Sequence, residues 1–194
     1  MRPPAEHVHW LFATALLMLA LLMLAEVIVG QEVWRRRRWR AYLFPATVFV
    51  TGLGLWPVTV FFTSSTIHML AHSVWAQTMM LAGAVQLALV HGRLRNALWE
   101  LTLPAGVFVS GVAFLVHEQN PWLFSRAAFL HHALGWTLVA GASLPLARAL
   151  RPQSRAIGAA FALMVVVLSV LLFADRDVAP VFGHLDPLAG EPKR

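Results

Sequence analysis

Residues 8–40 read VHWLFATALLMLALLMLAEVIVGQEVWRRRRWR. The apolar run Val8–Gly30 is long enough to cross a bilayer, which takes about 20 apolar residues in a helix. Five arginines follow it within residues 35–40, and a basic block of this kind stays on the cytoplasmic side of a membrane. The stretch therefore predicts a transmembrane helix that begins outside and ends at the cytoplasmic face.

Further apolar runs of similar length follow, separated by short polar segments: Ala41–Phe62, Ile67–Val90, Ala97–His117, Leu123–Ala147 and Ala156–Ala174. Together the runs predict an all-α, polytopic membrane helix bundle with six transmembrane helices and both termini outside. Residues 1–174 are expected to form this single transmembrane domain. Residues 175–194 are polar and rich in Pro and Gly, which predicts a flexible outer, periplasmic tail.

The charges agree with this topology. Arginines fall at each expected cytoplasmic end: Arg35, Arg36, Arg37, Arg38, Arg40, Arg93, Arg95, Arg148, Arg151 and Arg155. This positive-inside pattern accounts for the net charge of +6, so no nucleic-acid partner is needed to explain it. Only 12% of residues are charged and 59% are hydrophobic, which excludes an ordinary soluble domain. We expect a protein of the bacterial inner membrane, in contact with lipid, because arginine greatly outnumbers lysine, as in proteins of GC-rich bacteria.

The predicted topology places nearly all of the nine histidines at the outer face. Histidine is costly in lipid, so a histidine within a span is a functional hypothesis by default. His68 and His72 lie four residues apart and share one helix face. His117 ends the next span, and the span after it carries His131 and His132. Adjacent positions point about 100° apart on a helix, so only one of His131 and His132 is expected to be a ligand, and the sequence leaves open which.

A metal site is the chemistry that these residues favour. The chain has no cysteine, so a soft metal would be held by His and Met alone. Imidazole suits copper, zinc, iron and nickel, and thioether sulfur favours Cu(I). Met69 adjoins His68, and Met79 lies two turns beyond His72. Glu26 and Glu100 lie deeper, where they could serve a proton or ion route or pair with arginine.

The segment Ser65-Thr66-Ile67-His68-Met69-Leu70-Ala71-His72 resembles the serine–x–x–histidine–methionine–x–x–histidine stretch of the CtaG-like copper-oxidase assembly factors. In that family a later outward helix ends in His, and the helix after the next outer loop carries further His. His117 and His131/His132 are similar in order and spacing, so the resemblance covers roughly residues 50–140. Seven spans are expected in the family, against six here.

This resemblance implies that copper is delivered to an oxidase at the outer side of the membrane. The partner would be a copper-oxidase subunit or a periplasmic copper chaperone. The implied copper ligands in this chain are His68, Met69, His72, His117 and His131 or His132.

Two functions follow from the residues. The first is copper delivery or transport, and because no ATP-binding motif is present, any transport would be passive or ion-coupled. The alternative is a b-type haem protein of electron transfer, with His72 and His131/His132 as axial ligands on different helices. A catalytic role is less expected than either, because membrane di-metal oxygenases use larger histidine sets, often at the cytoplasmic face. A purely structural subunit without metal remains open.

Overall fold

The computed structural model describes residues 5–62, 66–116 and 124–175 of the chain, with side chains over 6–58, 72–116 and 129–175. All regular structure within these ranges is helical. The elements are α1 (Ala5–Val29), α2 (Gln31–Arg35), α3 (Arg38–Ala41), α4 (Leu43–Phe62), α5 (Thr66–His91), η1 (Ala97–Leu101), α6 (Thr102–Val116), α7 (Phe124–Gly141), α8 (Ser143–Leu150) and α9 (Arg155–Phe173).

The all-α prediction is confirmed over the described residues, and the long apolar helices are compatible with the predicted membrane protein. Five helical segments are long and apolar enough to cross a membrane: Glu6–Val29, His72–His91, Ala97–Val116, Phe129–Leu150 and Arg155–Phe173. The described part of α4, Leu43–Val58, is apolar but shorter. The sixth span and the side of each terminus therefore stay predictions.

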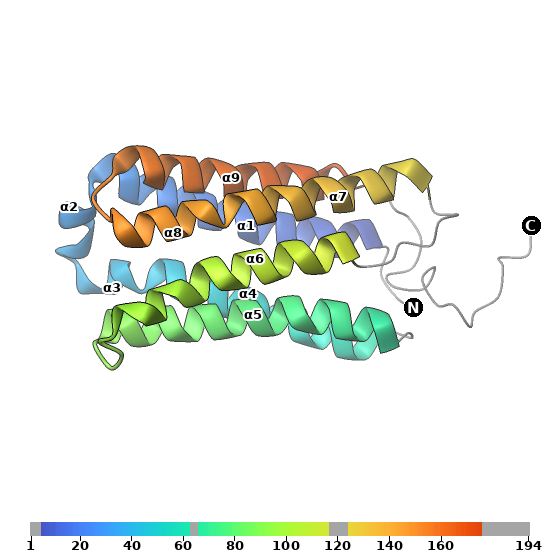
Figure 1. Cartoon of the computed structure of the whole chain (residues 1–194), viewed down its shortest axis with the longest axis horizontal. Helices are drawn as coiled ribbons and strands as arrows, with labels where there is room; N and C mark the ends of the chain where they lie inside the picture. Colours follow the sequence, from blue (N-terminus) through green and yellow to red (C-terminus); the bar gives the residue numbers. More distant parts are fainter. Residues whose placement is uncertain (1–4, 63–65, 117–123, 176–194) are drawn as a thin grey trace, which may run out of the picture.

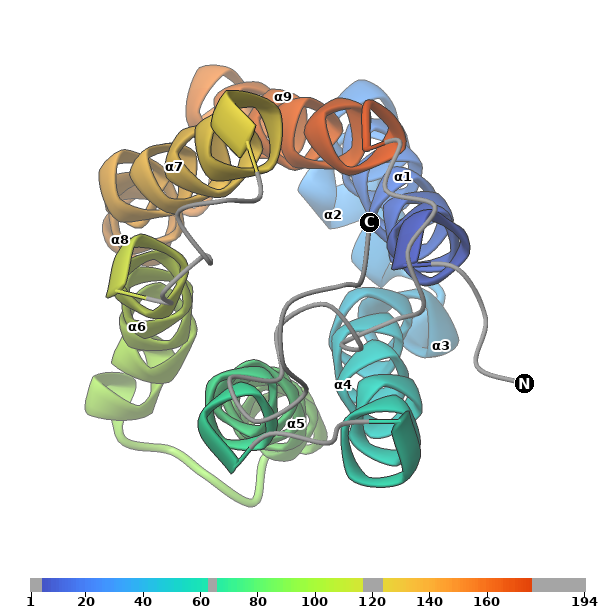
Figure 2. The same cartoon turned by 90° about the vertical axis from the view of Figure 1, so that its right-hand side faces the viewer.

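The long helices form a ring in chain order: α1, α4, α5, α6, α7 with α8, and α9, which closes on α1 (Figure 2). They run lengthwise through the molecule (Figure 1). The most extensive contacts join α4 to α5, α1 to α9 and α6 to α7, whereas α1 meets α4, and α7 meets α9, over much smaller areas. The bundle is thus three tight helix pairs arranged around a common axis.

Glycines allow the close approach within these pairs. A Cβ atom at Gly83 of α5 would lie 2.6 Å from the backbone nitrogen of Phe49 in α4. In the α6–α7 pair, a Cβ at Gly111 would lie 2.7 Å from the backbone nitrogen of Val139. Small residues that let two backbones meet are a common means of helix association in membranes, where the hydrophobic effect between helices is weak.

The arginine-rich segments gather at one end of the bundle, the basic end, where α2, α3 and α8 lie (left in Figure 1). Glu26 of α1 accepts a hydrogen bond of 2.7 Å from Arg148 of α8. Gln86 of α5 donates to Glu100 in η1 over 3.1 Å. Glu26 therefore takes the arginine pairing that the sequence left open, and Glu100 is held by an amide.

Candidate ligand-binding cavity at the histidine end

A cavity of about 210 Å³ lies between the helices, lined by residues of α1, α4, α5, α6, α7 and α9. On α5 its lining extends from His72 to Ala82, about 15 Å at 1.5 Å of rise per residue. Glycine contacts hold α4 close to α5 and α6 close to α7, and the side chains that face the common axis leave this space between the helices. The volume exceeds the roughly 150 Å³ of an engineered apolar cavity that binds benzene.

Polar groups in the cavity lining are unevenly distributed. The end of the bundle opposite the arginines is here called the histidine end. Four titratable side chains of the lining lie there: His9, His72, His131 and Asp175. The hydroxyl residues Thr51, Thr78 and Ser110 lie at middle depth. Toward the basic end the lining is apolar, with Leu19, Val48, Leu103, Leu138 and Phe161 among its side chains. The cavity lining is therefore polar at one end and apolar at the other.

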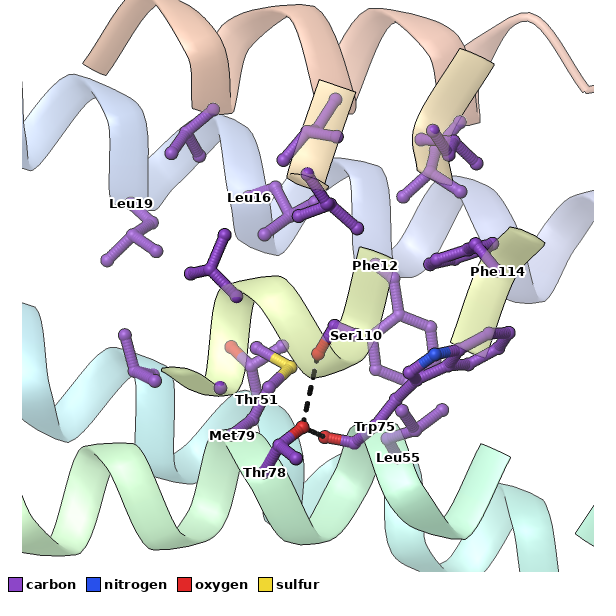
Figure 3. A pocket seen from close by; sticks show the side chains of 18 of the residues that line it. Phe12, Leu16, Leu19, Thr51, Leu55, Trp75, Thr78, Met79, Ser110 and Phe114 are labelled. Carbon is purple, nitrogen blue, oxygen red and sulfur yellow. Dashed lines mark hydrogen bonds between the residues drawn. The ribbon is translucent and has the colours of Figure 1, made fainter. Parts of the chain in front are cut away.

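An aromatic bridge connects two of the histidines. His72 is buried and lies edge-on to Trp75, with ring centroids 4.5 Å apart. Trp75 stacks on Phe114 of α6, with centroids 4.1 Å apart and an angle of 17° between the planes. The ring centroid of Phe114 in turn lies 5.7 Å from that of His131 in α7. Figure 3 shows the Trp75–Phe114 pair beside Phe12 of α1.

One turn deeper, a pair of hydrogen-bonded hydroxyls joins α5 to α6; this pair, Thr78 and Ser110, is here called the hydroxyl rung. The hydroxyls of Thr78 and Ser110 lie 3.2 Å apart, and the Thr78 hydroxyl donates to the carbonyl of Trp75 over 3.0 Å (Figure 3). Since Thr78 has one hydroxyl proton and uses it on that carbonyl, Ser110 is the donor between the two hydroxyls. The pair therefore presents hydroxyl oxygens to the cavity directly below the aromatic bridge.

A second set of polar contacts at the histidine end joins α1 to Asp175, which follows α9. The imidazole Nδ1 of His9 is in contact with the Asp175 carboxylate. The indole of Trp10 donates to the carbonyl of Asp175 over 3.2 Å. Ser169, which is fully buried, donates to the carbonyl of Ala13 over 2.8 Å. Asp175, where the predicted tail begins, is thus packed on the bundle.

The predicted ligand residues divide into three groups. His72, His131 and Met79 line the cavity, whereas His132 is exposed and does not belong to the described lining. His68 and Met69 are in α5, but their side chains lie outside the described residues, as does His117. Among the described residues, no group of three or more His, Asp or Glu side chains is close enough to hold a metal ion.

Sequence reasoning missed the pairing of His9 with Asp175. His9 carries the usual signature of an interfacial histidine, and its partner is 166 positions away. Helical periodicity is the signal that could have pointed to His9, because His9, Phe12, Leu16 and Leu19 share one face of α1. All four line the cavity. Comparisons with protein families, curated proteins and solved structures found no match to this chain.

Proposed function

We propose that this chain binds copper at the histidine end of its cavity and delivers it at the outer face of the bacterial inner membrane. The observation that carries the proposal is that His72 and His131, which come from different helices, line one cavity. Imidazole is a common copper ligand, and a site without cysteine suits copper better than it suits thiolate-bound metals. His68, Met69 and His117 are the further ligands that we propose.

The position of Met79 along α5 decides whether it can bind the same copper ion as His72. It lies seven residues beyond His72, about 10 Å deeper along α5 at 1.5 Å per residue. One copper ion cannot contact both side chains, because metal–ligand bonds to nitrogen are only about 2 Å long. Met79 would therefore hold copper only at a separate, deeper position.

The apolar half of the cavity favours delivery over permeation. A cation that moved past the hydroxyls and the Met79 thioether would meet Leu19, Val48, Leu103, Leu138 and Phe161. Placing a charge among such side chains without ligands is very costly. Copper that enters from the histidine end is thus expected to leave by the same end, toward a copper-oxidase subunit or a periplasmic copper chaperone. The positive-inside rule puts that end outside.

The adjacent histidines of α7 supply the test and its control. We expect His131→Ala to lose most of the copper that the untagged wild-type protein retains after purification in mild detergent. His132→Ala removes the same side chain one position along the helix and should keep a wild-type copper content. Elemental analysis of both variants, normalised to protein, makes the measurement. Equal copper content in the two variants would refute a site at His131.

A b-type haem site is the second candidate, favoured by the apolar lining that surrounds histidines from two helices. In that case His72 and His131 would bind one iron from opposite sides. Trp75 and Phe114 bridge these imidazoles in the structure, so the bridge would have to open to admit a macrocycle. The same bridge links the imidazoles that would bind one copper ion, but a haem macrocycle, being far larger than an ion, would require the bridge to open much further. A Soret absorption band that His72→Ala abolishes would support haem instead.

A further inference from the structure

The apolar part of the cavity is larger than a copper site needs, and its lining favours a different kind of ligand. We propose that it binds a neutral amphiphile of the isoprenoid quinone class. The flat headgroup lies against the Trp75–Phe114 bridge, and the hydrocarbon tail extends toward the basic end. This inference goes beyond the copper proposal and does not depend on it.

The headgroup is inferred from the walls of the polar half. Phe12, Trp75 and Phe114 come from three helices and line one level of the cavity. Aromatic walls favour a planar group, which they contact by offset stacking or edge-on packing. One turn deeper lie the hydroxyls of Thr78 and Ser110. The Ser110 hydroxyl, which donates to Thr78 in the ligand-free cavity, can rotate and donate its proton to a ligand carbonyl instead. A ring that carries carbonyl groups fits such a combination of flat apolar surface and hydroxyls.

The charge of the headgroup is inferred from the same lining. Among the described residues that line the cavity there is no Lys or Arg, and the acidic side chain present is Asp175, which His9 contacts. A fatty-acid carboxylate or a lipid phosphate would meet that carboxylate, and the described lining offers no Lys or Arg to neutralise the ligand's charge. Burying an anion there is costly, so the ligand should be neutral.

The tail is inferred from the other half of the cavity. Below the hydroxyl rung, the described lining consists of aliphatic and aromatic side chains from every long helix. A slender hydrocarbon gains about 25 cal/mol for each Å² of apolar surface that it removes from water. Gly106 of α6 lines this part, and a Cβ at that position would meet its nearest atom at 3.6 Å, an ordinary contact distance. A Cβ at Gly106 therefore fits against α5 at an ordinary distance, and the remaining atoms of a larger side chain would have to take space from the cavity that Gly106 lines.

Two glycine variants separate occupation of the cavity from general effects on helices. Gly106→Leu fills the tail site. Gly54→Leu, on the exposed side of α4 where a Cβ has no neighbour within 4 Å, is the matched control. Each protein is placed metal-free in phosphatidylcholine nanodiscs, and its thermal midpoint is measured with and without decylubiquinone. Nonspecific partitioning of the quinone into the lipid affects all the proteins alike.

We expect saturating decylubiquinone to raise the midpoint of the wild type and of Gly54→Leu by about 5–10 °C, the shift for a ligand at about 100 times its Kd. Gly106→Leu should shift by less than about 1 °C. If Gly106→Leu does not fold, Ser110→Ala serves in its place and should bind decylubiquinone about fivefold to tenfold more weakly. Decanol and decanoate, which carry the same tail length on other heads, should have little effect on the wild type.

The quinone and copper proposals can fail separately. Gly106→Leu should keep its copper, and His131→Ala should keep its response to decylubiquinone. An unchanged response in Gly106→Leu would overturn the cavity as the binding site. Equal responses to decanol and decylubiquinone would overturn the quinone headgroup and leave a site for hydrocarbon tails, and a stronger response to decanoate would overturn the neutral headgroup.

Discussion

Each end of the bundle holds a carboxylate that is mostly buried, but the two ends use their polar groups differently. At the basic end, Glu26 has a 12% exposed side chain and pairs with Arg148. At the histidine end, Asp175 also has a 12% exposed side chain and pairs with His9. The basic pair lines a separate pocket of about 190 Å³ and contributes nothing to the lining of the central cavity. The histidine pair lines the central cavity itself.

This difference indicates that the two ends have separate tasks. Arginine keeps its charge at any physiological pH, so Arg148 suits a permanent anchor between α1 and α8. Histidine changes its charge easily and binds metals through a neutral ring nitrogen. Side chains of that kind belong at a site where ligands enter and leave. We therefore expect the basic end to set the orientation of the bundle, and the chemistry that we propose to take place at the histidine end.

The largest expected effect concerns the orientation of the two ends. The chain has no cysteine, so a single introduced cysteine can be labelled without background. His7→Cys and Gln153→Cys place it at exposed positions of the histidine and basic ends, respectively. A membrane-impermeant maleimide should label intact cells only through His7→Cys, because the positive-inside rule predicts that the arginine-rich end faces the cytoplasm. Lysed cells should label both variants, and the reverse pattern in intact cells would invert the assignment.

The two ion pairs should differ in what each contributes to stability. Glu26→Gln leaves a mostly buried guanidinium that cannot lose its proton, at a cost of about 3 kcal/mol. Asp175→Asn leaves an imidazole that can be neutral and still form a hydrogen bond, at a cost of about 1 kcal/mol. For a chain of this length, the corresponding losses in thermal midpoint are about 6–12 °C and 2–4 °C. A larger loss for Asp175→Asn would show that the histidine end is itself a main structural anchor.

A smaller effect is expected from the contact that locks α4 against α5 between the two ends. Gly83→Ala places a methyl group 2.6 Å from the Phe49 backbone and should cost about 1–3 kcal/mol. Gly54→Ala meets no atom within 4 Å and should leave the thermal midpoint unchanged or slightly raised, because alanine favours a helix over glycine. Equal midpoints for the two variants would mean that close packing of this pair is not required.

The helices could be predicted closely from the sequence because a bilayer fixes their length. The run Ala156–Ala174 corresponds to α9, Arg155–Phe173, and the run Val8–Gly30 corresponds to α1, Ala5–Val29. These boundaries depend on local composition and on charged flanks, both of which can be read directly. The pairing of Glu26 with an arginine was also foreseeable, since it lies near a ring of basic helix ends.

The cavity and the choice between His131 and His132 could not be predicted. Which face of α7 turns inward depends on its packing against α6, where Gly135 and Leu115 meet. That packing is a long-range property, and a rotation of about 100° exchanges the two histidines. The cavity likewise arises from how three helix pairs meet, which no single helix encodes. His68, Met69 and His117 remain predicted ligands, because their side chains lie outside the described residues.

The central claim, copper at the histidine end, is tested most directly by an absorption spectrum and elemental analysis of the untagged protein purified in mild detergent. The account predicts near-stoichiometric copper and no Soret band. A Soret band at about 410–430 nm would contradict it and make His72 and His131 axial haem ligands. Protein that retains neither copper nor haem after exposure to Cu(I) would also contradict it and leave the cavity to its apolar ligand alone.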